Sequence, residues 1–334
     1  MPNTLFLHLG LHKTASTTFQ ETCRTNQKQL KKQGFIYPLF CCRQANKTEI
    51  SNHSIPIRSA FGNNPTSYWI NQIWEIKDIE QTNNSYKQQL ASALKSGDNL
   101  ILSGEGISLL SEQELVNFTR FVKEFNYDIK AFGLVRPPLE FATSAYQEMI
   151  KGGDHFPLIS FGNFTTSYLT EASQKIPTRS LQISTLRKFF ETNIEFQPFH
   201  KACAHPMGPT AYILERIGVS SKSIKTAEKQ NKSMSNLQTR LQNFINKAEP
   251  KIINGTININ HRQIIHMPIS RGNNCKFHLS KDEYDLVSDQ VENCRNQYKK
   301  LLGSDFLDDT IHLSKPIKNQ TIIEIFNDFL VPQQ

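Results

Sequence analysis

The stretch that most restricts the fold of this chain is residues 4–20. Residues 5–9 are apolar enough for a buried strand of a parallel sheet, and a helical pattern begins at Phe19. The loop between them carries Gly10 and a run of donor side chains: Lys13, Thr14, Ser16, Thr17 and Thr18. A strand, a short loop and a helix N-terminus aim backbone N–H groups at one point. The sequence therefore predicts an anion-binding loop, although an ordinary strand–turn–helix with a Thr or Ser cap has the same pattern.

Apolar segments of strand length alternate with amphipathic helices through the first 150 residues. We expect strands at 35–38, 99–103 and 128–135, and helices at 20–33, 66–95, 111–125 and 139–151. This order predicts an α/β fold with a doubly wound, mostly parallel sheet flanked by helices. Ligands of such sheets bind beyond the carboxyl ends of the strands, where Gly10, Glu105 and Arg136 are expected. Residues 40–66 are polar and show no regular pattern.

The second half of the chain is less regular and is expected to be more helical. Helices are predicted at 164–174, 186–192, 210–217, 237–248 and 281–301, with a strand at 194–199. Leu181 is expected in a strand or a turn, and residues 220–236 form a polar segment. Because there is no internal repeat and no low-complexity linker, we predict one domain over 1–334, with a core at 1–150 and a more helical part at 151–334.

Composition limits the classes of ligand and compartment. The net charge of +8 favours anionic ligands. Nucleic acid is one such ligand. Because the basic residues are spread along the chain, with short clusters only at 31–32 and 299–300, we expect no binding of nucleic acid. The six cysteines form no Cys-x-x-Cys pair, so we expect no zinc and reduced thiols in the cytoplasm. No apolar run has the length of a membrane span, and the chain enters its first strand at once, so we expect neither an anchor nor a signal peptide.

The order of residues in the first loop separates two kinds of phosphate-binding motif. A Walker A loop ends in Gly-Lys-[Ser/Thr], and this chain has no Gly-Lys pair. The lysine-first order of residues 13–18 resembles the 5′-phosphosulfate loop of sulfotransferases that use 3′-phosphoadenosine 5′-phosphosulfate (PAPS), usually Lys-[Ser/Thr/Gly]-Gly-Thr-[Thr/Ser]. Ala15 stands where glycine is usual, and Ser16 where threonine is usual. Since alanine carries a Cβ, we expect Ala15 to avoid the left-handed conformation.

Arg136 and Ser144 form a second motif, where the strand at 128–135 is followed by a helix. An arginine fork and a serine hydroxyl can converge on one phosphate. The pair, with Tyr146 two residues beyond the serine, resembles the 3′-phosphate-binding segment of the same family. An arginine at a strand end can equally bind strand carbonyls. The two motifs together, in this order and each at a strand-to-helix junction, are more specific than either alone.

The resemblance implies a P-loop-like sulfotransferase fold and the transfer of a sulfuryl group from PAPS to a hydroxyl or amine, without a metal. Residues 1–150 would be the nucleotide-binding core, and 151–334 would supply the acceptor side and closing elements. Lys13 would contact the bridging oxygen and the sulfonate, and residues 14–18 the 5′-phosphate. The residues assigned to PAPS are His12, Lys13, Thr14, Ala15, Ser16, Thr17, Thr18, Arg136, Ser144, Asn231 and Ser233. Lys229 and Lys232 are further candidates in the same polar segment, which can equally be a solvated loop.

Three residues are candidates for the general base. Glu105 follows a buried strand and is the first choice, although it could instead cap a helix or pair with a cation. His53 lies in the segment expected to face the acceptor, and it could equally have no catalytic role. Glu21, on the first helix, is the third. His12 could contact substrate or only pack.

The acceptor is not readable from the residues. The segments expected to line its pocket, 40–66 and 152–165, mix basic, amide and aromatic side chains, which suits a glycan or glycolipid of a bacterial envelope first, and a small alcohol or phenol second. Three other functions remain compatible with the sequence: a P-loop-type kinase or NTPase, a non-catalytic nucleotide-binding protein, and a basic module that binds nucleic acid.

Overall fold

The computed structural model describes residues 3–11, 13–161, 175–228, 233–253, 256–258, 261, 275–307, 310–315 and 317. The chain divides into two compact units. The first comprises Met1–Arg136, Arg179–Gln230 and Leu301–Phe306, and the second Pro137–Thr178, Asn231–Lys300 and Leu307–Gln334. A single domain over 1–334 stays a prediction.

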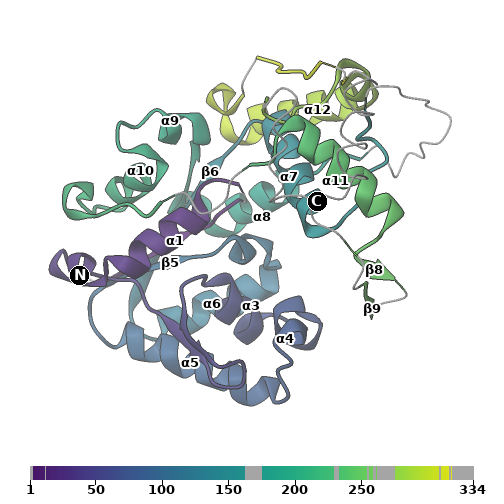
Figure 1. Cartoon of the computed structure of the whole chain (residues 1–334). Helices are drawn as coiled ribbons and strands as arrows, with labels where there is room; N and C mark the ends of the chain where they lie inside the picture. The colour runs from purple at the N-terminus through teal and green to yellow at the C-terminus, as the bar shows by residue number, and fades with distance from the viewer. Residues whose placement is uncertain are drawn as a thin grey trace. The chain divides into compact units, whose positions relative to one another are not determined.

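A five-stranded parallel sheet forms the centre of the first unit (Figure 1). Its strands pair in the order β2 (Phe35–Ile36), β5 (Asn99–Ser103), β1 (Asn3–His8), β6 (Tyr127–Val135) and β7 (Ile194–Pro198). Leu5 of β1 lies opposite Leu100 in β5 and Ile129 in β6. The middle strands each contain a run of apolar residues, at 5–7, 100–102 and 131–135, as expected for a sheet that is covered on both faces. The α/β fold with a mostly parallel sheet is confirmed.

Helices cover both faces of this sheet. On one face, α1 (Ser16–Thr25), α2 (Gln27–Lys32), α9 (Phe199–Cys203) and α10 (Gly208–Arg216) share a core cluster that contains Phe19, Phe132 and Ile213. Figure 1 shows α3 (Ser54–Phe61), α5 (Ile79–Leu94) and α6 (Glu112–Lys123) on the other side of the sheet. Since β1 and β5 run parallel side by side, their carboxyl ends share one edge, and the segments after His8 and Ser103 begin there.

Residues 40–66 contain regular structure, so the prediction of an irregular segment was wrong. β3 (Phe40–Cys42) and β4 (Lys47–Ile50) form an antiparallel hairpin, whose turn ends at the left-handed Asn46. After it come α3 and the short 3-10 helix η1 (Pro65–Ser67). The hairpin was missed because its strands have 3 and 4 residues, too few to show an alternation. Pro56 obscured α3, although proline is tolerated in a first helical turn.

Two segments predicted as single helices are broken. The segment 66–95 forms α4 (Trp69–Ile73) and then α5, separated by the left-handed Glu75. The carboxylate of Asp78 starts the second helix by accepting the N–H of Gln81 at 2.8 Å. The segment 20–33 is divided between α1 and α2 at Asn26. Leu181 belongs to α8 (Ser180–Phe190), so the expected strand or turn there was wrong.

The described part of the second unit is mainly helical. It contains α7 (Pro138–Gly152), α11 (Asn236–Ala248) and most of α12 (Lys281–Leu302), with a small hairpin of β8 (Ile252–Ile253) and β9 (Thr256–Ile257). Arg240 and Glu283 join α11 to α12 by a buried ion pair, with side chains 2% and 0% exposed. The helix predicted at 164–174 lies outside the described residues. Every helix of the described part is too short or too polar to cross a membrane.

Candidate functional site

The loop between β1 and α1 has an unusual backbone. Lys13 and Ala15 both have left-handed backbone angles, with φ of 59° and 66°. The expectation that Ala15 avoids this conformation was therefore wrong. The loop keeps it although a left-handed residue with a Cβ is less stable by about 1–2 kcal/mol. Turns with left-handed residues aim successive backbone N–H groups at one concave side, as in the nests that bind anions.

The loop leads directly into the N-terminus of α1, a helix of 10 residues. No described side chain caps this end, and its first turn, Ser16, Thr17 and Thr18, contains no acidic residue. The first N–H groups of a helix have no partner within the helix, and the helix dipole adds a partial positive charge there. The end of α1 is therefore open to an anion.

Two hydroxyl groups of this loop are buried with no hydrogen-bond partner among the described residues: Thr14 Oγ1 and Ser16 Oγ. Thr14 is 1% exposed and Ser16 is 2% exposed. A buried hydroxyl without a partner costs about 1–3 kcal/mol. Two such groups in one loop point to a bound group that supplies acceptors, and the oxygens of a phosphate or a sulfonate can do so.

Glu105 reaches this loop from the neighbouring strand. It opens the 3-10 helix η2 (Glu105–Leu109), directly after β5 and Gly104. A Cβ built on Gly10 would lie 2.3 Å from Ser16 Oγ and 2.8 Å from Glu105 Cγ. Both side chains therefore pack on the Cα of Gly10, where only glycine fits. Glu105 therefore lies beside the same loop as the buried hydroxyl of Ser16.

Arg136 also contacts the loop. It follows β6, and its Nε donates a hydrogen bond of 2.5 Å to the backbone carbonyl of Lys13. Its guanidinium lies over the ring of Phe199, 4.2 Å from the ring centroid. Lys13 and Arg136, which belong to the two sequence motifs, are thus adjacent in the first unit. The sequence left open that Arg136 binds strand carbonyls. In the structure it binds a backbone carbonyl, which belongs to the loop and not to a strand.

The remaining residues assigned to PAPS belong to the second unit or lie outside the described residues. Ser144 is half-buried on α7, and Ser233 is exposed just before α11; both belong to the second unit. His12, Lys229, Asn231 and Lys232 lie outside the described residues. Their roles stay predictions.

His53, the second candidate base, is fully buried just before α3. Its Nδ1 accepts the backbone N–H of Ser103 at 2.8 Å, and its Nε2 lies 2.7 Å from the carbonyl of Pro38, to which it donates. Burial lowers the pKa of His53 to about 4. Both ring nitrogens are thus engaged with backbone groups, so the ring is poorly placed to take a proton from a substrate.

Glu21, the third candidate, is held by a neighbouring arginine. The carboxylate of Glu21 accepts two hydrogen bonds of 2.8 Å from Arg24 on the next turn of α1. This hydrogen bonding lowers the pKa of Glu21. A carboxylate with a lowered pKa is a weaker base, so the geometry favours Glu105 over Glu21.

His8 is a buried residue that sequence reasoning missed. Its ring lies between Phe132 and Phe19, with both ring centroids at 4.9 Å, and its Nδ1 is 2.8 Å from the Ser103 hydroxyl. Burial lowers the pKa of His8 to about 3. The sequence signal for this residue was a histidine that directly follows the apolar residues 5–7.

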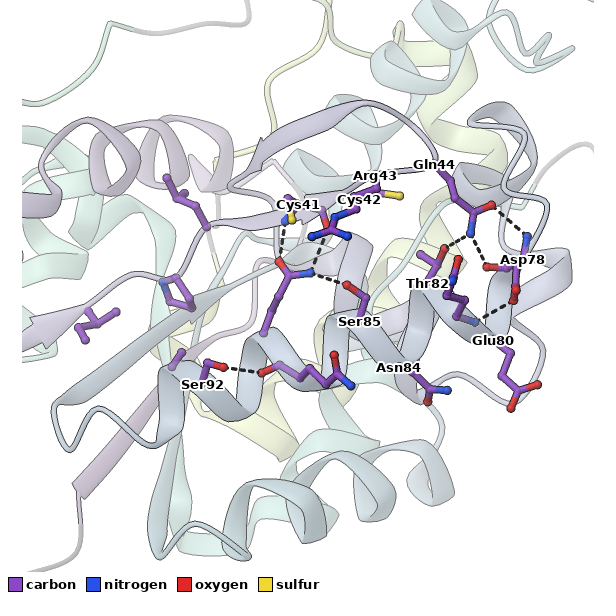
Figure 2. A pocket seen from close by; sticks show the side chains of 17 residues that line it. Cys41, Cys42, Arg43, Gln44, Asp78, Glu80, Thr82, Asn84, Ser85 and Ser92 are labelled. Carbon is purple, nitrogen blue, oxygen red and sulfur yellow. Dashed lines mark hydrogen bonds between the residues drawn. The ribbon is translucent and has the colours of Figure 1, made fainter.

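A groove of about 1120 Å³ runs between β3 and α5 (Figure 2). The side chain of Gln89 fixes one wall by accepting the N–H of Cys41 at 2.7 Å and donating to its carbonyl at 3.1 Å. Gln44 fixes one end by donating to Thr82 Oγ1 at 2.8 Å. Amide and hydroxyl side chains are the largest group in the lining, among them Gln81, Asn84, Ser85, Gln88 and Ser92. Ile36, Pro38, Leu39 and Ala93 are apolar, and Arg43, Asp78 and Glu80 are charged. Residues 41–44 belong to the segment expected to face the acceptor.

No family model and no curated protein matches the sequence. Two solved structures resemble the chain, and both are sulfotransferases. One is a sulfotransferase from Alicyclobacillus acidocaldarius, with 14% identity, a TM-score of 0.38, and coverage of 73% of this chain and 91% of that one. The other is the sulfotransferase domain from the curacin biosynthetic pathway, with 11% identity, a TM-score of 0.35, and coverage of 98% of each chain. At these identities and TM-scores, neither similarity shows the family of this chain.

Proposed function

We propose that this protein is a sulfotransferase that moves a sulfuryl group from PAPS to a hydroxyl or amine of an acceptor. The observation that carries this proposal is the pair of buried hydroxyls without a partner, Thr14 and Ser16, at the open N-terminus of α1. That arrangement suits a phosphate group of a nucleotide. The lysine at the start of the loop and the absence of a Gly-Lys pair favour PAPS over a nucleoside triphosphate.

In the proposed reaction, one part of the site stabilises the leaving phosphate and another part takes the proton of the acceptor. The bond from sulfur to the bridging oxygen of PAPS breaks, a bond from sulfur to the acceptor oxygen or nitrogen forms, and the acceptor loses a proton. Lys13 and the first turn of α1 stabilise the negative charge that develops on the leaving phosphate. Glu105 takes the proton, since it lies beside the loop on the neighbouring strand end. Arg136 and Ser144 hold the 3′-phosphate in this proposal. Among the described residues, no group of three or more His, Cys, Asp or Glu side chains could hold a metal ion.

The acceptor we propose is a saccharide. The groove between β3 and α5 supports this choice, because neutral amide and hydroxyl groups suit the hydroxyls of a sugar. In this proposal the six cysteines are reduced thiols, which suits the cytoplasm as the compartment.

Titration calorimetry with 3′-phosphoadenosine 5′-phosphate, the product nucleotide, tests the donor site. We expect binding by the wild type, and a loss of about 10–100-fold in affinity for Lys13→Ala, the effect of one charge-assisted hydrogen bond of ~1.5–3 kcal/mol. Lys28→Ala, on the exposed side of α2, is the matched control and should not change the affinity. Failure of the folded wild type to bind the nucleotide would contradict the proposal. Magnesium-dependent turnover of ATP would instead identify a P-loop-type kinase or NTPase.

A further inference from the structure

The turn that carries Glu105 is interlocked with the segment at His53 and Ser54. The backbone N–H of His53 donates to the carbonyl of Ser103 at 3.0 Å, and the N–H of Ser103 donates back to His53 Nδ1 at 2.8 Å. On the other side of Glu105, the N–H of Gly106 donates to Ser54 Oγ at 2.8 Å. Three hydrogen bonds therefore join residues 53–54 to residues 103 and 106, which flank Glu105 closely.

The two glycines around Glu105 allow this close approach. A Cβ built on Gly104 would lie 2.4 Å from the backbone nitrogen of Ser54. A Cβ built on Gly106 would lie 2.9 Å from Ser54 Cβ and 2.7 Å from Arg58 Cδ. Neither position has room for a side chain, so the Gly-Glu-Gly sequence packs its backbone directly on Ser54.

The other side of Ser103 is held by β1 and α1. Its hydroxyl lies 2.8 Å from His8 Nδ1, and its carbonyl also accepts Gln20 Nε2 at 3.2 Å. The N–H of Gly104 donates to the carbonyl of His8 at 3.2 Å. The strand end before Glu105 is thus fixed from two directions. On the side that faces away from β1, the hydrogen bonds to residues 103 and 106 come from His53 and Ser54.

We infer that His53 and Ser54 are positioning residues, which hold Glu105 beside the loop between β1 and α1. This inference rests on the proposed function, in which Glu105 is the base. It also gives His53 a role other than that of the base. The ring accepts at Nδ1, so its proton is on Nε2 and is donated to the Pro38 carbonyl. Protonation of Nδ1 would remove the acceptor for Ser103.

Two substitutions of His53 separate its two hydrogen bonds. The side-chain oxygen of asparagine reaches the place of Nδ1, so His53→Asn keeps an acceptor for the N–H of Ser103 and loses the bond to Pro38. The amide of glutamine reaches the place of Nε2, so His53→Gln keeps the donor to Pro38 and leaves the N–H of Ser103 without its partner. Each variant loses one buried hydrogen bond, so a purely structural residue would respond alike to both.

The measurement is the release of sulfate and 3′-phosphoadenosine 5′-phosphate from PAPS with water as acceptor, with Glu105→Gln as the reference for loss of the base. We expect His53→Gln to lower kcat by about 10²-fold, the effect of a misplacement near 1 Å, with KM for PAPS changed less than about threefold. His53→Asn should stay within about threefold of the wild type in both. Equal losses in the two variants, or a wild-type kcat in His53→Gln, would overturn the inference.

Amide hydrogen exchange separates failure of this inference from failure of the proposed function, because it needs neither donor nor acceptor. The amides of Ser103 and Gly106 should exchange faster than in the wild type in His53→Gln and Ser54→Ala respectively. If wild-type PAPS turnover is absent while these shifts occur, the function fails and the interlock is upheld. If exchange is unchanged in both variants, the positioning role is wrong. Should His53→Gln fail to fold, Ser54→Ala provides the same comparison of kcat with KM.

Discussion

Replacing Ala15 by glycine tests whether the loop stores backbone strain. Ala15 has φ 66° and ψ 16°, in the left-handed region. Glycine adopts these angles without a steric cost, so Ala15→Gly removes a penalty of about 1–2 kcal/mol from the folded state. It also makes the unfolded chain more flexible, which lowers stability by about 0.4–1 kcal/mol. The expected net effect is a gain of about 0.5–1 kcal/mol in the free energy of unfolding.

The matched control is the same change in a helix. Ala91 lies in α5 and is half-buried, and Ala91→Gly should lower the free energy of unfolding by about 0.5–1 kcal/mol. The side-chain change is the same in both variants, whereas Ala15 has left-handed and Ala91 helical backbone angles, so opposite signs are expected. Urea unfolding, followed by the far-ultraviolet circular dichroism signal, measures both. A loss of stability in Ala15→Gly as large as that in Ala91→Gly would refute the reasoning.

The buried hydroxyl of Ser16 makes a second prediction: Ser16→Ala should stabilise the nucleotide-free protein by about 1 kcal/mol, because a polar group without a partner is removed, while weakening nucleotide binding in calorimetry. Weaker stability without any change in affinity would contradict it. For the buried ion pair of the second unit, Arg240→Met should lower stability by about 3–5 kcal/mol, because Glu283 is left buried without its cation. The exposed pair Lys281–Asp285 is the control, and Lys281→Ala should cost less than about 1 kcal/mol. The last prediction concerns pH. Burial lowers the pKa of His53 to about 4, so the unfolded chain binds a proton that the native state does not between pH 6.5 and 4. The free energy of unfolding should therefore fall as the pH drops through that window, by up to ~1.4 kcal/mol per pH unit from this group. Urea titrations at several pH values should show that the free energy of unfolding of His53→Asn depends less steeply on pH by that amount.

The strands of the sheet could be predicted because their signal is local. Each of β1, β5 and β6 contains a continuous, largely buried segment that is almost entirely apolar: residues 5–7, 100–102 and 131–135. The start of α6 was visible in the same way: Ser111 and Glu114 form the capping box that their spacing indicates. The hairpin of β3 and β4 has no such signal, since its few residues are stabilised by contacts with α5 rather than by their own pattern.

The candidate site could be predicted in its residue types but not in its geometry. Lys13 to Thr18 were recognised as a group of donors, whereas the left-handed angle at Ala15 opposes its local preference and is imposed by the loop as a whole. The place of His53 depends on Pro38 and Ser103, which lie 15 and 50 residues away in the sequence. Contacts at such separations leave no trace in the neighbouring residues.

The contact of Gln89 with Cys41 has a consequence for the behaviour of the chain in solution. Within the described residues, β4 is the one strand that pairs with β3, and the other edge of a strand in such a hairpin can recruit a strand from a second molecule. The carboxamide of Gln89 binds both backbone groups of Cys41 at that edge, as a neighbouring strand would. The backbone groups of Cys41 that Gln89 binds are therefore not available to pair with a strand of a second molecule.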